Sequence, residues 1–356
     1  MDHGTGRMTP PLRTGLVGYG TGGRHFHAPF IEAAQGVILA GVVARGPLTI
    51  ERVRADHPAI PVHASLTEML NAGVDAVTIT TPPQTRRALV LEAVEAGVHV
   101  IADKPFAPSA AAAIELAEAA RARGMTLGVF HNRRWDTDAQ TLKKVLDSGA
   151  LGRLWRMHSR MDLDDPATLV PGPTGGLLRD TGSHLVDQAL WLLGPAVSVQ
   201  GHLDMANFAH GRTDVGFTLT IRHESGACSQ LNASKTNRLT AKEFLIYGEN
   251  GSYVSSQSDV QAQAIFSGKR PAGNLEGWGF EDMSRWGTLR TAAGEQRVPS
   301  EQGCYHAYYQ DFARAVRTGS RPPVTAEDAI AVLEVLDAAR LSAEEGREVR
   351  LDDRRS

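Results

Sequence analysis

The chain has 356 residues, of which 37 are basic and 40 acidic, so its formal net charge at pH 7 is −3. This near balance creates no global field that would attract nucleic acid or an anionic membrane, and we expect no partner of either kind. The length indicates about two domains, since a domain typically has roughly 100 to 200 residues. With 42% apolar residues and 36 glycines, the composition is typical of a globular protein and excludes a small disulfide scaffold.

The cysteine content indicates the compartment. The sequence contains two cysteines, Cys228 and Cys304, whereas a chain of this size in an oxidising compartment more often carries several pairs. We therefore expect a cytoplasmic protein. No run approaches the ~18 consecutive apolar residues of a membrane span, and residues 1–13 lack the apolar core of an export signal. Residues 1–12 are predicted to form a disordered tail.

Residues 13–130 alternate short apolar runs with amphipathic stretches, which is the pattern of parallel strands joined by crossover helices. This order predicts an α/β Rossmann domain, a doubly wound parallel sheet with helices on both faces. Strands are expected at 14–18, 37–44, 75–80, 98–102 and 126–130, and helices at 26–34, 50–55, 65–72, 85–96 and 110–123.

Residues 131–324 follow a different pattern, in which apolar runs succeed one another with few helical stretches between them. Gly, Asn and charged turns separate these runs, which favours antiparallel pairing. We expect an α+β domain with an open, mostly antiparallel sheet, and a C-terminal helix and tail at 325–356 that packs back on the Rossmann domain. Strands are expected at 154–162, 196–206, 214–222, 227–234, 243–247 and 251–255, and helices at 182–193, 305–317 and 326–344. Residues 268–287 are expected to form a long loop or a segment that faces a partner.

Three glycines, Gly18, Gly20 and Gly23, form a GxGxxG pattern directly after the first predicted strand and before the first predicted helix. Because about one residue in ten is glycine, the bare pattern arises ~0.3 times by chance in a chain of this length and is weak alone. The position of the pattern between a predicted strand and a predicted helix makes it a stronger indication of a binding site, since such a turn brings backbone N–H groups and a helix N-terminus against a pyrophosphate. The sequence predicts dinucleotide binding, with a glycine-rich connection without a ligand as the alternative.

The residues after the second predicted strand bear on which dinucleotide is bound. An NAD site usually presents Asp or Glu there, where the carboxylate accepts from the ribose 2′-hydroxyl. The segment reads GVVARGP, contains no acid, and places Arg45 in that region. A guanidinium can pair with a 2′-phosphate, so the sequence favours NADP over NAD. An ordinary solvated arginine is the alternative.

Lys104 is the first candidate for catalysis. It lies between Asp103 and Pro105 at the carboxyl end of a predicted strand, the edge where open α/β sheets bind ligands. Pro105 keeps Lys104 out of the α region, so the lysine stays extended at the strand end. Oxidation of a carbinol releases a proton as hydride leaves, and a desolvated lysine beside a positive nicotinamide ring can accept it. A solvated loop lysine is the alternative.

A second candidate group lies on a helix predicted in the later half of the chain. Asp180, His184 and Asp187 are spaced i, i+4 and i+7 in RDTGSHLVDQ, so they share one helix face. An imidazole can pass a proton near neutral pH, and Asp180 can accept from a substrate hydroxyl or orient that base. The alternatives are a helix cap for Asp180 and a satisfied core histidine for His184.

Other reactive residue types give weaker signals. The histidines and cysteines lack metal-ligand spacing, so no metal site is expected. No GxSxG elbow occurs, which leaves nucleophilic catalysis without support. The segment HNRRWD places Arg133 and Trp135 at the domain junction, where they either contact substrate or pack the junction.

Taken together, GxGxxG with FHAP after it, DKP at a strand end, HNRRWD at the junction and DTGSHLVDQ on a later helix resemble the Gfo/Idh/MocA oxidoreductase family. FHAP, HNRRWD and the closing GCYHAYYQDFARAVRTG with PPVTAEDA resemble its NADP-dependent scyllo-inositol dehydrogenase group. The resemblance implies substrate in an interdomain cleft and a homodimer or homotetramer formed through the C-terminal sheet. It also implies that Lys104 and His184 share acid–base work, while Asp180 positions the histidine or the substrate.

The resemblance widens the expected site and shows three departures from the family. Asp103 stands where Glu is usual, Arg86 stands where His is common, and 161–176 lacks an arginine- and tryptophan-rich stretch. Asp162 can hydrogen-bond sugar hydroxyls, with a solvated acidic loop as the alternative. The expected cofactor contacts are Gly18, Tyr19, Gly20, Thr21, Gly22, Gly23, His27, Arg45, Thr81, Pro82, Arg86, Asp103 and Lys104, and the expected substrate contacts are Lys104, Arg133, Trp135, Asp162, Asp180 and His184.

The sequence therefore predicts an NADP(H)-dependent oxidoreductase that moves hydride between a ring CH–OH of an inositol, polyol or sugar and the nicotinamide. A first alternative is a ketosugar or imine reductase on the same scaffold, which would consume NADPH. A second is a dinucleotide-binding regulator without catalysis, against which the presence of Lys104, Asp180 and His184 argues.

Overall fold

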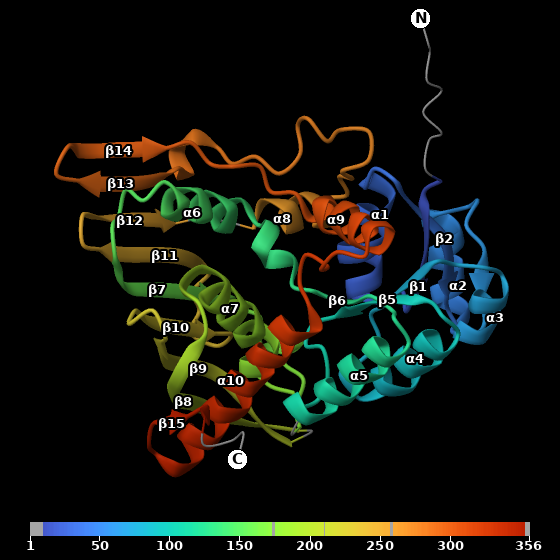
Figure 1. Cartoon of the computed structure of the whole chain (residues 1–356), viewed down its shortest axis with the longest axis horizontal. Helices are drawn as coiled ribbons and strands as arrows, with labels where there is room; N and C mark the ends of the chain where they lie inside the picture. Colours follow the sequence, from blue (N-terminus) through green and yellow to red (C-terminus); the bar gives the residue numbers. More distant parts are fainter. Residues whose placement is uncertain (1–9, 173–174, 210, 257–258, 353–356) are drawn as a thin grey trace, which may run out of the picture.

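The computed structural model describes residues 10–172, 175–209, 211–256 and 259–352 (Figure 1). Most of the tail predicted at 1–12 lies outside the described residues, and the first strand begins at Leu12. Figure 1 shows the two sheets of the described chain at opposite sides of the molecule, with helices between them.

The N-terminal part folds around a six-stranded parallel sheet with the strand order β3-β2-β1-β4-β5-β6. This is the predicted Rossmann sheet. Its order reverses between β1 and β4, and ligands of such sheets bind at the carboxyl ends of the strands on either side of that point. The strand residues are apolar and mostly buried, because helices cover both faces. The strands are β1 (Leu12–Val17), β2 (Val37–Val43), β3 (Val62–His63), β4 (Ala76–Ile79), β5 (His99–Asp103) and β6 (Leu127–Phe130).

The helices that connect these strands lie close to their predicted positions, whereas the two-residue strand β3 has no counterpart in the prediction. Local capping explains two of the helix starts, since the hydroxyls of Ser65 and Ser109 accept from backbone N–H groups three residues later. The first helical segment begins as a π-helical turn. The helices are η1 (Gly22–His27), α1 (Ala28–Ala33), α2 (Pro47–Asp56), α3 (Leu66–Asn71), α4 (Pro83–Glu95) and α5 (Ala110–Ala122).

The later strands form a nine-stranded sheet with the order β14-β13-β12-β11-β7-β10-β9-β8-β15. Most neighbours are antiparallel, as predicted, but β7 and β10 run parallel side by side. Along β10 and β11 fully buried side chains alternate with half-exposed or exposed ones, so one face of the sheet is the more deeply covered. The strands are β7 (Leu154–Asp162), β8 (Ala196–Phe208), β9 (Gly211–His223), β10 (Cys228–Ser234), β11 (Ala241–Gly248), β12 (Gly251–Ser256), β13 (Gly287–Thr291), β14 (Gly294–Val298) and β15 (Val349–Arg350).

Two long helices connect this sheet to the first domain. Helix α7 packs against β7, β9 and β10, and α10 packs against β8, α7 and α5, so α10 bridges the two halves (Figure 1). A capping box between Thr325 and Asp328 starts α10. The helical segments of this half are η2 (Asn132–Trp135), α6 (Thr137–Asp147), η3 (Pro166–Thr168), α7 (Leu177–Leu193), α8 (Val260–Phe266), η4 (Met283–Arg285), α9 (Tyr305–Thr318) and α10 (Ala326–Glu345).

Helix α7 begins at Leu177, whereas the local pattern predicts a start at 182. The residue before it, Gly176, has φ of 88° and no side chain that could cap the helix. The cap comes from β9 instead, since the carboxylate of Asp214 accepts from the Leu178 N–H at 2.6 Å. The capping alternative for Asp180 is therefore wrong, because a distant strand supplies that group.

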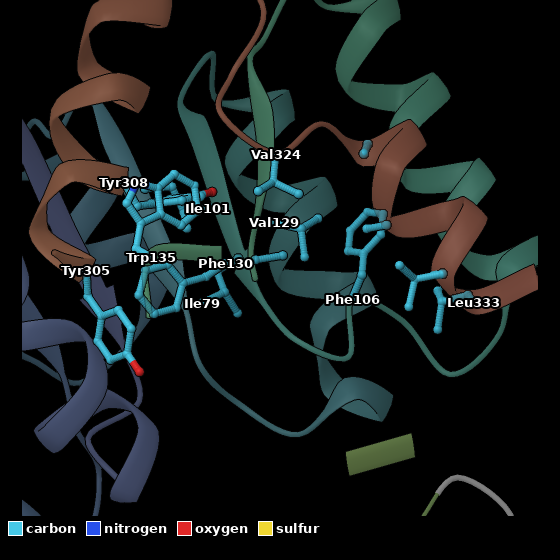
Figure 2. Packing of buried hydrophobic residues seen from close by; sticks show 14 of the residues in the cluster. Ile79, Ile101, Phe106, Val129, Phe130, Trp135, Tyr305, Tyr308, Val324 and Leu333 are labelled. Atoms are coloured by element: carbon cyan, nitrogen blue, oxygen red, sulfur yellow. The ribbon is translucent and has the colours of Figure 1, made fainter. Parts of the chain in front are cut away.

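Aromatic side chains fill the junction between the two halves (Figure 2). Tyr308 of α9 meets Phe130 at the end of β6 and Trp135 of η2 in edge-to-face contacts, with ring centroids 4.9 and 5.3 Å apart. Beside them the Val129 N–H donates to the carbonyl of Val324, which holds the segment before α10 against β6. This packing fixes the end of β6 relative to the second half of the chain.

The segment that follows β12 contains elements absent from the prediction. Helix α8 is short, and β13 with β14 forms a hairpin at the edge of the nine-stranded sheet. The predicted loop at 268–287 is irregular over most of its length, as expected. Phe266 at the end of α8 packs on His25 and Phe26 of η1, with centroids 5.2 and 5.8 Å apart. This part of the second half therefore lies against the helix that follows the glycine loop.

Candidate active site

Backbone conformation and close packing require two of the three glycines of the GxGxxG loop, and the third leaves its backbone open. Gly18 directly follows β1 and has φ of 98°, a conformation that side-chain-bearing residues rarely adopt. A Cβ on Gly23 would lie 2.2 Å from the Gly18 carbonyl oxygen, so η1 packs too closely on the strand end for any larger residue. A Cβ on Gly20 would meet nothing within 4 Å, which leaves the backbone there open to a ligand. These properties fit a dinucleotide pyrophosphate.

The loop is anchored to the neighbouring helix by a small ionic cluster. Tyr19 is buried, and its hydroxyl donates to the Asp56 carboxylate of α2 at 2.9 Å. Arg24 of η1 pairs with the same carboxylate at 2.7 Å. Burial and the hydrogen bond to Asp56 raise the pKa of Tyr19. Thr21 is exposed on the loop, and a Cβ on Gly22 would lie 3.2 Å from the Asp103 carboxylate.

Asp103 and His27 support the strand end that carries the predicted catalytic lysine. Asp103 Oδ1 accepts from the backbone N–H of Lys104 at 2.8 Å, and its Oδ2 lies 3.4 Å from His27 Nε2. His27 is fully buried, and its Nδ1 hydrogen-bonds to the Tyr309 hydroxyl at 2.6 Å. Burial would raise the pKa of Asp103, but His27 and Arg86 lower it below its ordinary value. The carboxylate is therefore ionised and shapes the backbone at Lys104.

Arg86 connects two strand ends from inside the protein. Its guanidinium is buried and donates to the carbonyl of Thr81 after β4, at 2.7 Å. It also donates to the carbonyls of Asp103, the last residue of β5, and of Pro105. Burial lowers its pKa to about 10, so the group remains a cation at neutral pH. The contacts of Arg86 are thus to backbone. Thr81 and Pro82, the other predicted cofactor contacts at this edge, begin the segment that Arg86 holds.

Lys104, at the end of β5, and Asp180, in the first turn of α7, form an ion pair. The Lys104 Nζ lies 2.7 Å from Asp180 Oδ1 and also donates to the Asp180 carbonyl at 3.3 Å. Asp180 Oδ2 accepts at 3.0 Å from Lys235, which sequence reasoning missed. Partial burial would raise the pKa of Asp180, but Lys104 and Lys235 lower it well below its ordinary value. Asp180 is therefore a carboxylate held between two lysines.

His184 lies one turn further along α7 and is buried. Burial, followed by the charges of Lys104 and Arg133, lowers its pKa well below its ordinary value, so the imidazole is neutral at pH 7. Its Nδ1 has no hydrogen-bond partner among the described residues. Both oxygens of Asp180 are engaged by lysines, so the structure pairs Asp180 with Lys104 and Lys235 and leaves His184 beside them.

Asp187, on the same predicted helix face, belongs to a different group. Its carboxylate binds the guanidinium of Arg134 through two nitrogens, with a shortest distance of 2.7 Å, and both residues are buried. His131 lies 3.9 Å from the same carboxylate. Asp187 therefore fastens α7 to η2 at the junction and lies away from Lys104.

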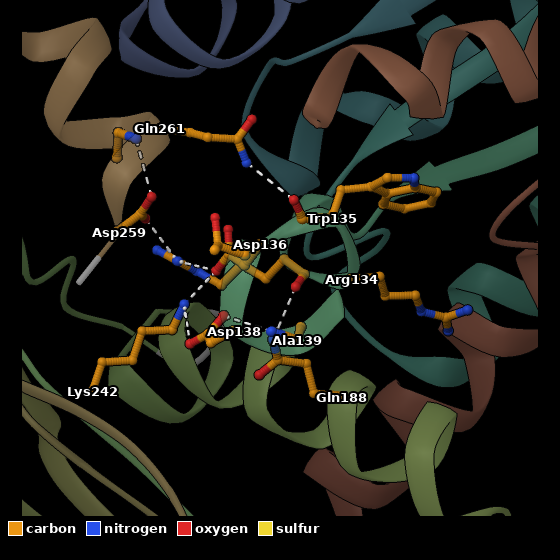
Figure 3. Close-up of polar contacts among 12 residues, drawn as sticks. Arg134, Trp135, Asp136, Asp138, Ala139, Gln188, Lys242, Asp259 and Gln261 are labelled. Carbon is orange, nitrogen blue, oxygen red and sulfur yellow. Dashed lines mark hydrogen bonds and ion pairs between the residues drawn. The ribbon is translucent and has the colours of Figure 1, made fainter. Parts of the chain in front are cut away.

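Arg133 belongs to a buried cluster of ion pairs. Figure 3 labels the other charged members of the cluster, Asp136, Asp138, Lys242 and Asp259. The guanidinium of Arg133 pairs with Asp136 at 3.0 Å and with Asp259 at 2.7 Å, while Lys242 pairs with Asp136 and Asp138. Burying these charges is costly, and mutual pairing offsets most of that cost. The guanidinium of Arg133 thus already has two carboxylate partners.

The remaining predicted residues lie further from Lys104 or on the surface. Trp135 is buried in the junction core, which favours the packing interpretation. Asp162 ends β7, is buried, and pairs with Arg160 on the same strand. Arg45 follows β2 and is exposed. Its guanidinium is therefore available to a ligand.

A cavity of about 300 Å³ lies between the Rossmann strand ends and the start of α7. It brings Lys104 and Asp180 together with Pro82, and adds Thr168 and Arg179, which the sequence did not indicate. A larger cavity of about 570 Å³ lies by the far end of α7 and contains none of the predicted site residues. The residues lining the smaller cavity are Pro82, Pro83, Gln84, Lys104, Pro105, Thr168, Leu169, Val170, Gly175, Gly176, Arg179 and Asp180.

Among residues 10–172, 175–209, 211–256 and 259–352, no group of three or more His, Cys, Asp or Glu side chains is arranged to hold a metal ion. No helix there is long and apolar enough to cross a membrane.

Comparison with known proteins identifies the family. A model described as an oxidoreductase family with an NAD-binding Rossmann fold matches residues 12–131, and one described as the GFO/IDH/MocA C-terminal domain matches residues 139–254. The oxidoreductase YdgJ of Escherichia coli (strain K12) is 34% identical over 346 residues, which cover 94% of this chain and 97% of YdgJ. The scyllo-inositol 2-dehydrogenase (NADP(+)) IolW of Bacillus subtilis (strain 168) is 29% identical over 356 residues, covering 97% and 98%.

The solved structures agree with this relationship. The structure of YPO2259 from Yersinia pestis matches with a TM-score of 0.87 at 32% identity, covering 96% of this chain and 98% of that one. The chain belongs to the Gfo/Idh/MocA family of NAD(P)-binding oxidoreductases. The family and fold inferred from the sequence motifs are thereby confirmed.

Buried neutral histidines make stability depend on pH. Burial lowers the pKa of both His131 and His184, so in the folded protein they stay neutral to lower pH than in the unfolded chain. Below about pH 6.5 the unfolded state binds the extra protons. We therefore expect the free energy of unfolding to fall between pH 7 and pH 5, measured by urea unfolding. His184→Gln should flatten that slope, whereas His202→Gln at an exposed site should keep it; an unchanged slope in His184→Gln would contradict the assignment.

Proposed function

We propose that the protein is an NADP(H)-dependent oxidoreductase that interconverts a ring CH–OH of an inositol, polyol or sugar with the corresponding ketone. The observation that carries the proposal is the position of Lys104, whose ammonium is bound to Asp180 at the wall of a cavity beside the Rossmann strand ends. The glycine loop fits a dinucleotide, and IolW, an NADP(+)-dependent scyllo-inositol 2-dehydrogenase, is similar over nearly the whole chain.

The residues of the site supply proton transfer and orientation. When bound, the dinucleotide supplies a nicotinamide ring that accepts or donates hydride. In the oxidation direction Lys104 enters as the neutral amine and takes the hydroxyl proton on its Nζ, and in reduction the ammonium returns that proton. Asp180 holds Nζ at 2.7 Å and so sets its direction. His184 is neutral and beside Lys104, which suits it to hydrogen-bond the substrate without adding charge.

Removing the Lys104 amine tests the mechanism. A reduced-nicotinamide absorbance screen of inositols, aldoses and their keto forms should find turnover by the wild type. Lys104→Met should bind NADPH within about twofold of the wild type and lose about 100-fold or more in kcat, the usual contribution of a general base. Lys144→Met, at an exposed lysine paired with Glu301, is the control and should turn over normally. Wild-type turnover by Lys104→Met would refute the role of Lys104.

Reversing the charge at Arg45 tests the cofactor preference. An exposed guanidinium after β2 can pair with the 2′-phosphate that distinguishes NADP from NAD. Arg45→Asp should raise the KM for NADP+ by about 5- to 150-fold, which corresponds to losing about 1 to 3 kcal/mol, and should change the KM for NAD+ much less. Arg123→Asp at the exposed end of α5 should affect neither. Equal changes for both cofactors in Arg45→Asp would reject the preference for NADP.

We also propose that copies of the chain associate through the less covered face of the nine-stranded sheet. Leu245 and Tyr247 of β11 alternate with the buried Phe244 and Ile246 and so point to that face, where Tyr247 is 38% exposed. Sedimentation velocity should find a dimer or tetramer, and Leu245→Asp with Tyr247→Asp should shift it toward monomer. Leu48→Asp, at an exposed leucine of α2, should not. A monomeric wild type at tens of micromolar would exclude the proposal.

A further inference from the structure

Lys235 is a buried lysine at the end of a strand that faces the active-site cleft. It directly follows β10, and its backbone N–H continues the ladder to β9 by donating to the carbonyl of Val215 at 3.0 Å. Its side chain is 6% exposed, so the ammonium group has lost most of its hydrating water. An ammonium in such a place requires partners that replace the lost water.

The partners of Lys235 come from two other elements. Its Nζ donates to the hydroxyl of Thr168 in η3 at 2.8 Å and to Asp180 Oδ2 in α7 at 3.0 Å. The carboxylate therefore has one oxygen on Lys235 and the other on Lys104, which reaches it from the end of β5. One carboxylate thus joins two ammonium groups from different domains.

This arrangement differs from an ordinary structural ion pair. The Asp180 side chain is 49% exposed where it borders the cavity, although Lys235 beneath it is buried. The charged groups that face Asp180 are Lys104 and Lys235, whereas Arg179 on the same helix pairs with Asp337 of α10. His184, one turn on, faces Lys104 as well as charges of the junction cluster. With both lysines protonated, the triplet Lys104–Asp180–Lys235 therefore carries one net positive charge at the wall of the cavity.

We infer that Lys235 is a positioning residue of the reaction centre, which holds the second oxygen of Asp180 so that this carboxylate stays an unprotonated anchor for Lys104. The inference rests on the proposed function. In oxidation the substrate O–H bond breaks, an N–H bond forms at Lys104 Nζ, and the proton stays there, because Asp180 accepts hydrogen bonds from both lysines and takes no proton itself. In reduction the same proton returns to the substrate oxygen.

Kinetics of three variants test this role. Lys235→Met keeps the length of the side chain but removes its charge, and should bind NADPH within about twofold of the wild type. Its kcat should fall about tenfold or more, and the acidic limb of its pH–rate profile should move toward neutral pH, since Asp180 then protonates more readily. Lys235→Arg keeps the cation and should restore the position of the acidic limb. Thr168→Val removes the other partner of Lys235 and should produce a smaller loss with the same direction of shift.

A titration that needs no turnover separates this inference from the proposed function. In protein labelled with ¹³C at the aspartate carboxyl carbons, the Asp180 signal, assigned with Asp180→Asn, should report an ionised group to lower pH in the wild type than in Lys235→Met. Lys144→Met, at an exposed lysine, is the matched control and should titrate at Asp180 as the wild type does. If no substrate of the screen is turned over, the proposed function fails while this measurement still decides the role of Lys235.

Each result of these measurements either supports or overturns the role of Lys235. A shift of the Asp180 titration to higher pH in Lys235→Met, reversed in Lys235→Arg, supports the inference. An Asp180 titration that is the same in the wild type and in Lys235→Met overturns it, as does a kcat within twofold of the wild type with an unmoved acidic limb. If Lys235→Met does not fold, Thr168→Val and Lys235→Arg carry the same comparison, and an unshifted titration in Thr168→Val would then count against the inference.

Discussion

The ion pair between Asp180 and Lys104 is the interaction on which the proposed reaction centre depends, because it joins a strand end of the first domain to a helix of the second. Other groups of the protein fix the position of each partner. The backbone of Lys104 is fixed by the Asp103 carboxylate and by the buried Arg86, and α7 is fixed at its start by Asp214. Lys104 Nζ and Asp180 Oδ1, each supported separately, therefore lie 2.7 Å apart. Both residues line the cavity between the domains.

The junction around this centre is unusually rich in buried charge. The pair of Arg134 with Asp187 and the pair of Lys242 with Asp136 are buried, and hydrophobic side chains of similar volume could often replace such groups without loss of stability. Buried ion pairs allow few alternative arrangements, since a displaced partner leaves an uncompensated charge. They thus favour one placement of η2 and α7. Burial, followed by the charges of Lys104 and Arg133, lowers the pKa of His184 beside them.

Local sequence pattern was enough to predict the Rossmann sheet and the glycine loop, because strand periodicity and the strand-end position of a motif are local properties. It marked Lys104 and Asp180 as candidates, and the family resemblance then implied their roles. Local pattern was not enough where residues distant in the sequence determine the structure. The start of α7 depends on Asp214 of β9. Lys235 contacts Asp180 only because the fold brings the end of β10 beside α7. Helix α8 and the β13–β14 hairpin are short, and their sequences carry little periodicity, so their structure depends on packing against the rest of the fold.

The three carbonyl contacts of Arg86 have a consequence for ligand binding. The guanidinium ties the segments after β4 and β5 together through groups of the protein alone, so both segments are ordered before any ligand arrives. Ordering a loop on binding consumes part of the interaction free energy as lost conformational entropy. For the segments after β4 and β5, this conformational entropy is lost when the chain folds. A ligand therefore binds to segments that are already ordered.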